Sequence, residues 1–305
     1  RAGSLLGFDS NAHELVAIPD PDTFCQLPWN KRAARVFCTV FYGREEADKP
    51  GAFMEEDCRG NLRRIHRKFQ DDHDGLHLRV GCEPEMAWLN KGADGMPDGG
   101  PTKALAYHID QFEVLAPVYM KVIDYAHAMG LDMIQFDHED APGQLELNFT
   151  YDDTLRTADR LTTFRQICAQ VAREHNLIAC FMAKPIMGVS ANGCHHNMSL
   201  WRGGEDRPVI RVKGDLPGME SVFHHRQGGD NLFMGESEGW MPGPIGLHAI
   251  GGVMEHLPAL TAIGSSTVNS YRRMLDLGLW APVYADWGYQ NRTTALRVSA
   301  PGRME

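Results

Sequence analysis

The sequence predicts an α+β protein in which helices lie on one side of a large sheet. Segments with the apolar–polar alternation of strands occur throughout the chain, and segments with helical spacing of apolar residues come between them. No internal repeat or low-complexity segment is present. The 305 residues are enough for one large core or two domains.

The first part of the chain shows both periodicities clearly. Leu62, Ile65 and Phe69 recur at spacings of three and four, which predicts an amphipathic helix with a basic outer face. The segment GLHLRVGCEPEMAWL alternates and predicts a strand. The expected elements are short strands within 13–42, a helix over 52–71, a strand over 75–89, a loop over 91–102 and a long helix over 109–129.

The second part continues the mixture. Asp152 or Asp153 is suited to cap a helix that runs from Thr154 to Glu174. Residues 202–240 are polar and glycine-rich, which predicts a long surface excursion. The other expected elements are strands over 133–139, 144–151, 177–185 and 194–201, a turn over 188–193, a helix over 245–263 and a last strand pair within 284–298.

Composition argues against two classes of protein. The net charge of −10 does not suit a general nucleic-acid binder, which needs a basic face to displace counterions. No run approaches the ~18 apolar residues of a membrane span, and no charged-then-apolar segment resembles a signal peptide, so we expect a soluble, cytoplasmic protein without a membrane partner. The seven cysteines are an odd number and widely spread, which favours reduced, mostly buried thiols. The chain begins at Arg1 and ends at Glu305, and we expect it to be cut at both ends.

Paired glutamates are the first sign of chemistry. Glu83 and Glu85 flank Pro84 on a predicted strand, so their carboxylates point to the same face. Two like charges so close repel each other unless cations compensate them, and Mg²⁺ or Mn²⁺ suits carboxylate oxygens. The pair taken alone is more often two ordinary glutamates on a solvated strand edge.

A second acidic cluster and one histidine strengthen the metal hypothesis. Pro142 and Gly143 can turn the chain between Glu139 and Glu146, which would bring both carboxylates to one point. His195 stands on a predicted strand, where a neutral imidazole could complete a metal shell. Taken singly, such a histidine is more often a hydrogen-bonded core or surface residue.

Four ordered motifs resemble the signature segments of the glutamine synthetase family. They are GCEPEMAWL, DHEDAPGQLELNF, FMAKPIMG with NGCHHNMSLW, and VNSYRR with APVYADWGYQNRTTALRV. The resemblance extends from AGSLLGF to Glu305 and is greatest to the glutamate–amine ligases that make γ-glutamyl alkylamides or γ-glutamylanilide. It implies a large curved antiparallel sheet with helices over 51–305, truncated at its C-terminus, and the remnant of a small β-grasp-like domain over 1–50.

The resemblance also implies a ligand set and cofactors. Glu85, Glu139 and Glu146 match the ligands of the metal at the substrate end, and Glu139 also counts as catalytic. Glu83, His195 and Glu305 match the ligands of the metal at the ATP end. The cofactors implied are therefore ATP and two or three Mg²⁺ or Mn²⁺ ions.

Further positions match the residues that contact the substrates. Arg273, Arg292 and Arg297 are similar to the arginines that hold glutamate and stabilise the transferring phosphoryl group. Gly193 falls in the substrate-binding turn. The predicted nucleotide-binding residues are Ser199, Asn197, Arg303 and Arg297.

The amine site is where the sequence departs from its relatives. At the positions where glutamine synthetases bind ammonium with an aspartate and a glutamate, this chain has Ala2 and Trp280. A methyl group and an indole favour an alkylamine or an aromatic amine over ammonium or a cationic polyamine. The second position could instead be Leu279, because the segment before Ala281 is one residue longer than the family norm.

The expected reaction joins an organic amine to the γ-carboxylate of L-glutamate in a homo-oligomer, a dodecamer of two hexameric rings. Two alternatives within the family are a glutamine synthetase that uses ammonia and a catalytically silent binding or structural protein. A guanido kinase, which has a similar catalytic domain, is a further alternative that the DHEDAPGQLE segment disfavours.

Overall fold

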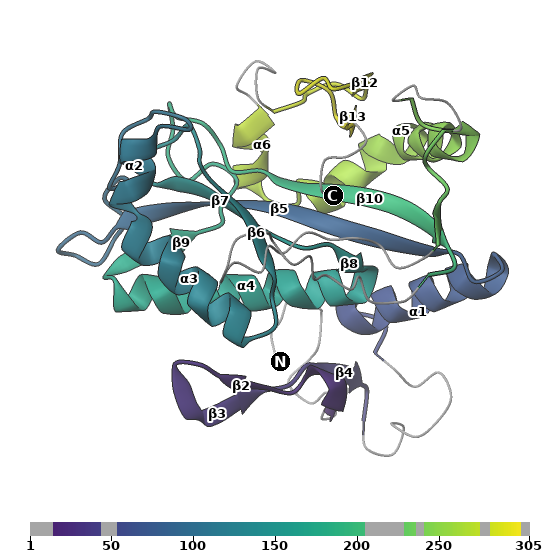
Figure 1. Cartoon of the computed structure of the whole chain (residues 1–305), viewed down its shortest axis with the longest axis horizontal. Coiled ribbons are helices and arrows are strands. Elements are labelled where there is room, and N and C mark those ends of the chain that lie inside the picture. Colours follow the sequence, from purple (N-terminus) through teal and green to yellow (C-terminus); the bar gives the residue numbers. More distant parts are fainter. Residues whose placement is uncertain (1–14, 44–53, 205–228, 236–240, 275–280, 300–305) are drawn as a thin grey trace, which may run out of the picture.

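A single sheet of seven strands is the centre of the molecule (Figure 1). The computed structural model describes residues 15–43, 54–204, 229–235, 241–274 and 281–299. Within these ranges the main strand order is β11-β10-β5-β7-β6, and β8 and β9 also pair with β5. Each of these pairings is antiparallel. The strands are β5 (His77–Asn90), β6 (Met133–His138), β7 (Gln144–Phe149), β8 (Asp152–Asp153), β9 (Leu177–Cys180), β10 (Cys194–Arg202) and β11 (Asp230–Asn231).

The long central strand β5 divides the molecule into two faces. Cys82, Met86 and Trp88 belong to the buried hydrophobic core. Glu83 and Glu85 alternate with them and therefore point to the opposite face. The period of two thus separates an apolar face, which packs on helices, from a face that carries carboxylates.

Helices cover the apolar face of the sheet. Helix α4 (Thr154–Glu174) contributes Phe164, Ile167, Cys168 and Val171, whose spacing of three and four forms one buried stripe. Burying side chains of this size stabilises the fold by about 1.5–3 kcal/mol each. Helices α1 (Cys58–Asp72), α2 (Ile109–Val114) and α3 (Ala116–Ala128) precede α4 in the chain, and α3 packs beside it under the sheet (Figure 1).

Most predicted elements are present, including the cap of α4, where the Asp153 carboxylate accepts hydrogen bonds from the backbone N–H groups of Leu155 and Arg156.

The prediction of a single helix over 109–129 is wrong. The segment breaks into α2 and α3 at Leu115. Pro117 lacks an N–H donor and is tolerated only in the first turn of a helix, so a new helix begins beside it.

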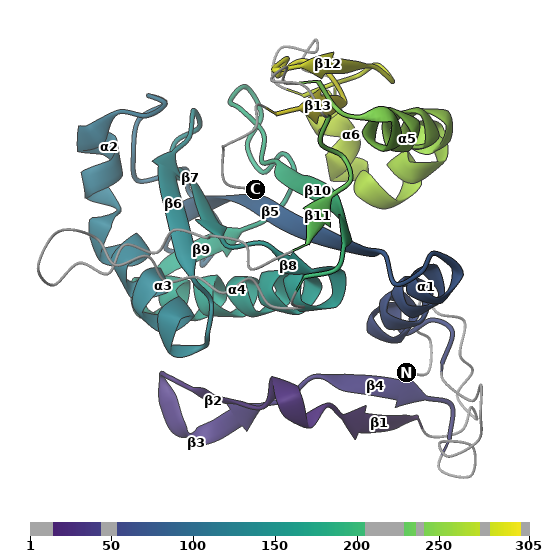
Figure 2. The ribbon, with the colours of Figure 1, turned by 45° about the vertical axis from the view of Figure 1, so that its right-hand side comes forward.

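Two further helices lie on the other side of the sheet. Helices α5 (Pro244–Gly264) and α6 (Val268–Met274) lie above the carboxylate-bearing face (Figure 2). The expectation that the helices share one side of the sheet holds for α3 and α4 but not for α5 and α6. The last strand pair is on the same side as α5 and α6, and it is parallel: β12 (Trp287–Tyr289) runs beside β13 (Leu296–Val298).

The N-terminal strands form two separate antiparallel pairs below the helices. Strand β1 (Val16–Pro19) pairs with β4 (Cys38–Phe41), and β2 (Cys25–Leu27) pairs with β3 (Asn30–Arg35); a 3-10 turn spans Pro21–Thr23. Arg59 of α1 joins them to the main body through ion pairs with Asp20 at 2.8 Å and Asp159 at 2.9 Å. The predicted domain boundary at residue 50 lies in 44–53, outside the described residues, and stays a prediction.

All seven cysteines are free thiols, but the expectation that most are buried is wrong. Cys82 and Cys168 are buried, whereas Cys58 and Cys194 are exposed and the other three are intermediate.

Among the described residues, no helix combines the length and apolar character needed to cross a membrane.

Candidate active site

Two of the predicted metal ligands lie directly opposite each other. Glu85 of β5 pairs in register with Glu146 of β7, and Asp137 of β6 is the next residue in the same row. Side chains paired in this way stand about 5 Å apart on one face of an antiparallel sheet. Three carboxylates from three strands thus form a row across the sheet.

A second pair of predicted ligands lies beside this row. Glu83 of β5 is in register with His195 of β10. Burial lowers the pKa of His195 against the opposing effect of the Glu83 charge, and the charge of Arg297 lowers it further. A lowered pKa keeps the imidazole neutral near pH 7, which is the form that can bind a metal.

Glu139 completes the acidic cluster from the loop that follows β6. Burial, together with the charges of Glu85 and Asp137, raises its pKa to about 7. The turn predicted between Glu139 and Glu146 is confirmed: Gly143 has a φ of 73°, and a Cβ there would lie 2.2 Å from the Trp88 carbonyl oxygen. Only glycine suits that turn.

The other two glutamates of the cluster are perturbed in the same way. Burial raises the pKa of Glu85 to about 7, and the charges of Glu146 and Glu83 add to that effect while the Gly193 N–H opposes it. Burial likewise raises the pKa of Glu146 to about 7, although its hydrogen bond from Asn148 opposes the change. Three neighbouring carboxylates with raised pKa values indicate that the protein itself supplies too little positive charge to balance them in their ionised form.

Amide side chains hold one oxygen of each of three carboxylates. Gln144 Nε2 donates to Glu85 Oε2 at 2.8 Å. Asn148 Nδ2 donates to Glu146 Oε1 at 2.7 Å, and Asn197 Nδ2 donates to Glu83 Oε1 at 2.9 Å. Such contacts fix the orientation of a carboxylate, as outer-shell partners do around metal ligands.

Gly193 lies where no larger residue fits. Its N–H donates to Glu85 Oε2 at 3.0 Å. A Cβ on this residue would be 2.8 Å from Glu85 Oε1 and 3.2 Å from His195 Nε2. The glycine therefore lets the glutamate and the histidine approach one point.

Arg273, one of the three predicted arginines, lies next to these groups. Arg273 of α6 donates to the carbonyl oxygen of Asn192 at 2.9 Å, and its charge acts on Glu85 and His195. Asn269, one turn earlier on α6, exchanges two hydrogen bonds with the backbone of Lys184. The helix is thereby attached to the loop between β9 and β10, and Arg273 is held above the carboxylates.

Arg292 and Arg297 occupy different environments. Arg297 lies on β13 of the last strand pair, whereas Arg292 lies outside both strands of that pair. Arg292 is exposed in the connection between β12 and β13, where its charge acts on Glu139. Arg292 lies in a turn that is closed by two hydrogen bonds, from the N–H and the hydroxyl of Thr293 to Asn291 Oδ1.

The remaining predicted residues divide into two groups. Ser199 is buried on β10, on the same face as His195, and its hydroxyl accepts a hydrogen bond from Trp201 Nε1 at 2.9 Å. A nucleotide contact by Ser199 or Asn197 stays a prediction. The other predicted positions lie outside the described residues: Ala2, Trp280, Arg303 and Glu305.

The donor set fits a pair of divalent cations, although the side chains are not closed around one. In the described ranges no three His, Cys, Asp or Glu side chains are ready to hold an ion as they stand. Half-buried carboxylates in register, each with one oxygen held by an amide, nevertheless match the oxygen ligands that Mg²⁺ and Mn²⁺ prefer. A cation would draw the free oxygens together.

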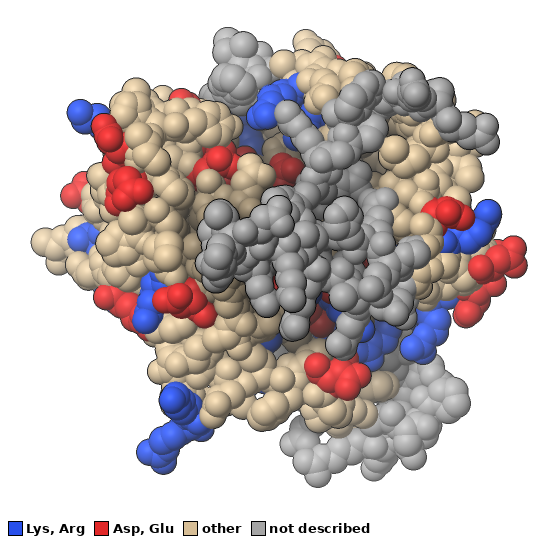
Figure 3. Space-filling view, viewed as in Figure 1, with Lys and Arg blue, Asp and Glu red and all other residues tan. Residues whose placement is uncertain are grey.

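The surface view is consistent with this charge arrangement. Acidic and basic side chains adjoin one another near the top of the face in Figure 3, below the position of β12 and β13 in Figure 1.

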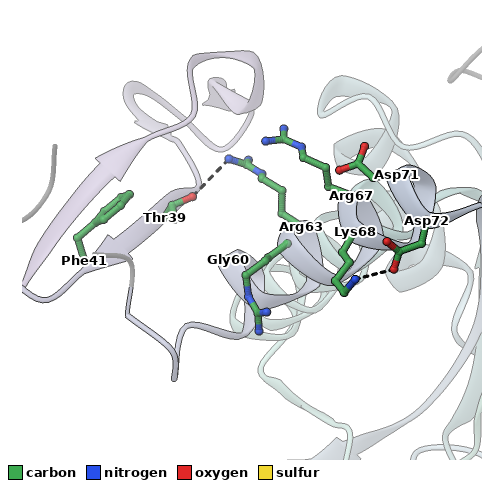
Figure 4. A pocket seen from close by; sticks show the side chains of 9 residues that line it. Thr39, Phe41, Gly60, Arg63, Arg67, Lys68, Asp71 and Asp72 are labelled. Atoms are coloured by element: carbon green, nitrogen blue, oxygen red, sulfur yellow. Dashed lines mark hydrogen bonds and ion pairs between the residues drawn. The ribbon is translucent and has the colours of Figure 1, made fainter. Parts of the chain in front are cut away.

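A separate cavity of about 600 Å³ lies between β4 and α1 and is lined by Thr39, Arg63, Arg67, Lys68 and other residues (Figure 4). Arg63 and Lys68 there are paired with Asp20 and Asp72, and the acidic row lies elsewhere.

Sequence reasoning missed several residues of the site. Asp137, Gln144 and Asn148 each stand two residues from a predicted ligand, so the period of two on β6 and β7 was an available signal. Tyr107 carried no such signal. It adopts a φ of 56°, its N–H donates to the His138 carbonyl at 2.8 Å, and its side chain lies beside Glu139 and Arg292.

Comparison with known proteins agrees with the geometry. Residues 55–305 match the family model "Glutamine synthetase, catalytic domain". The chain is 33% identical to a glutamine synthetase of Rhizobium meliloti, with 100% of this chain and 64% of the relative aligned. It is 34% identical to that of Pyrococcus abyssi, with 94% and 56% aligned. The chain thus spans 56–64% of the length of these two relatives.

Solved structures give the same result. The chain resembles apo GmaS, a gamma-glutamylmethylamide synthetase, with a TM-score of 0.77 and 30% identity over 97% of this chain and 62% of that one. An ADP complex of GmaS gives the same TM-score over 96% of this chain. A "novel glutamine synthase homolog" at 21% identity and a TM-score of 0.72 supports the fold alone. The matched catalytic domain, the curved antiparallel sheet and the ordered motifs together establish that this chain belongs to the glutamine synthetase family.

Proposed function

We propose that this protein is an ATP-dependent carbon–nitrogen ligase that joins an organic amine to the γ-carboxylate of L-glutamate. The observation that carries the proposal is the in-register row of Glu85 and Glu146, with Glu139 close by and Glu83 opposite His195. This set supports two cation positions on one face of the sheet. Family membership favours a ligase over a guanido kinase.

The chemistry requires activation of an unreactive carboxylate. We propose that the γ-carboxylate attacks the terminal phosphoryl group of ATP and displaces ADP, which forms γ-glutamyl phosphate. A neutral amine then displaces phosphate and loses a proton as the amide forms. Bound divalent cations would neutralise the charge on the phosphate oxygens during this transfer. Arg273 is suited to bind glutamate, because it is fixed by Asn192 and lies near Glu85. Arg292 and Arg297 are suited to stabilise the phosphoryl group.

The identity of the amine substrate is the most specific part of the proposal. The likeness to GmaS at 30% identity supports an alkylamine acceptor, and so do Ala2 and Trp280 at the positions that bind ammonium in glutamine synthetases. The curated relatives at 33–34% identity are named glutamine synthetases, which keeps ammonia as the second candidate.

A product assay tests the substrate. The protein is incubated with ATP, Mg²⁺ and glutamate, together with ammonium, methylamine, isopropylamine, aniline or putrescine, and the γ-glutamyl product is identified by mass spectrometry. We expect turnover to be highest with methylamine, isopropylamine or aniline. Higher turnover with ammonium would favour glutamine synthetase, and phosphate release that needs neither glutamate nor amine would contradict the ligase proposal.

We also propose a cytoplasmic homo-oligomer of two stacked hexameric rings. An ATP-dependent reaction is suited to the cytoplasm, and the ring assembly follows from family resemblance. The mass of the particle in solution, measured by light scattering, tests it: a dodecamer agrees, and a monomer contradicts it.

A further inference from the structure

The amide of Asn148 differs from the other two amides of the site. Gln144, Asn148 and Asn197 each donate to one carboxylate. The Gln144 oxygen also accepts a hydrogen bond from the Ala141 N–H at 2.9 Å. The Oδ1 of Asn148 is buried and finds no donor among the described residues. One acceptor at the edge of the acidic row is thus left without a partner.

The orientation of this amide follows from its neighbour. Nδ2 lies 2.7 Å from Glu146 Oε1. Exchanging the amide nitrogen and oxygen would place two acceptors at that distance, which is repulsive. The unpartnered atom is therefore the oxygen, and the Asn148 residue as a whole is 6% exposed.

The position of Asn148 limits what can supply the missing donor. It shares a face of β7 with Glu146 and lies opposite Gln135 of β6. Continuing the register of Glu85 with Glu146 by two residues brings Asn148 to the level of Glu83. It therefore stands between the two proposed cation positions, one at Glu146 and one at Glu83.

A cation in this row would bring the donor with it. Mg²⁺ and Mn²⁺ retain water molecules when carboxylates bind them, and those waters donate to nearby acceptors. We propose that Asn148 is a positioning residue of the cation site, whose Oδ1 accepts a hydrogen bond from a water molecule coordinated to the cation at Glu146. This inference rests on the cation site of the proposed function and adds a residue to it.

Mn²⁺ binding, measured from the free-ion signal in electron paramagnetic resonance, tests the inference. Asn148→Leu removes both the donor and the acceptor, and we expect it to weaken Mn²⁺ binding about 10–100-fold. Asn148→Thr keeps a hydroxyl that can donate to Glu146 but no second polar atom to accept from the coordinated water, and we expect it to bind Mn²⁺ nearly as weakly as the leucine variant. If the amide only orients Glu146, the threonine variant will bind Mn²⁺ nearly as tightly as the unaltered protein, and the inference is wrong.

Controls separate this inference from folding and from the ligase proposal. Asn61→Ala replaces a half-buried asparagine on α1, a helix that carries none of the site residues, and should leave Mn²⁺ binding unchanged. Asn148→Ala replaces the leucine variant if that one does not fold. Unchanged Mn²⁺ affinity in a folded leucine or alanine variant would show that an ordinary trapped water satisfies Oδ1 and would overturn the inference. The ligase proposal would stand in that case, because the product assay on the unaltered protein tests it independently.

Discussion

Glu85 and Glu146 face each other across two antiparallel strands, and burial raises the pKa of each to about 7. The hydrogen bonds from Gln144 to Glu85 and from Asn148 to Glu146 occupy one oxygen of each carboxylate. Nothing in the fold requires two glutamates to be opposed in this way, because like charges directly opposite destabilise a sheet. A site that binds positive charge explains the arrangement.

Gly193→Ala should disrupt the site while leaving the fold intact. The added methyl group would lie 2.8 Å from Glu85 Oε1 and 3.2 Å from His195 Nε2, so one of them must move. We expect the affinity for Mn²⁺ to fall at least about tenfold, as it does when ligand orientation is disturbed. Gly251→Ala is the matched control, since a Cβ there meets nothing within 4 Å in helix α5. Equal Mn²⁺ affinities in the two variants would contradict the assignment of Gly193.

Gln144→Ala should destabilise the protein. The side chain is 1% exposed and bonds to Glu85, Ala191, Asn192 and the Ala141 N–H. Its removal leaves buried groups unpaired, which costs about 1–3 kcal/mol of unfolding free energy. Urea denaturation measures this, with the exposed Gln26→Ala as control. A loss no larger than that of the control would show that the network is not structural.

Arg273→Met should weaken glutamate binding. Charge-assisted hydrogen bonds contribute about 1.5–3 kcal/mol, so KM for glutamate should rise about 10–100-fold. The adjacent Arg272 is exposed, and Arg272→Met changes the same kind of side chain without reaching the site. Steady-state kinetics of both variants make the comparison. A similar KM in the two variants would remove Arg273 from the substrate site.

The carboxylate pKa values predict how stability depends on pH. The native pKa values of Glu85, Glu139 and Glu146 are raised from 4.5 to about 7, so the metal-free native state retains protons that the unfolded chain has released. Its stability should therefore fall as pH rises from about 4.5 to about 7. Mg²⁺ needs the ionised forms, so it should raise Tm more at about pH 8 than at about pH 5.

Thermal unfolding in EDTA and in Mg²⁺ at several pH values measures both trends. Removing a negative charge with Glu146→Gln should reduce the loss of Tm in EDTA between the two pH values. A Mg²⁺ effect on Tm that is independent of pH would contradict the role given to these three glutamates.

Local signals in the sequence predicted much of the fold. Asp153 caps α4 because a carboxylate that precedes a helical pattern satisfies free N–H groups, and this depends on neighbouring residues alone. Leu115 ends α2 for an equally local reason, the proline two residues later, although the apolar spacing across 109–129 concealed the break. The positions of α5 and α6 above the sheet depend on distant contacts, such as that of Asn269 with Lys184.

The sequence predicted residues of the site, but it did not predict how they are arranged in space. The alternation around Pro84 correctly places Glu83 and Glu85 on one face of β5. The register that sets Glu85 against Glu146 and Glu83 against His195 joins strands far apart in the chain, and pairing over such separations is determined by the whole core. The amides of Gln144 and Asn148 acquire their role only once that register exists.

Anomalous X-ray scattering from crystals grown with Mn²⁺ tests the central claim most directly. We expect one peak touching Glu85, Glu139 and Glu146 and a second touching Glu83 and His195. Peaks located elsewhere, or none at these five side chains at saturating Mn²⁺, would contradict a cation-dependent ligase site on this face of the sheet.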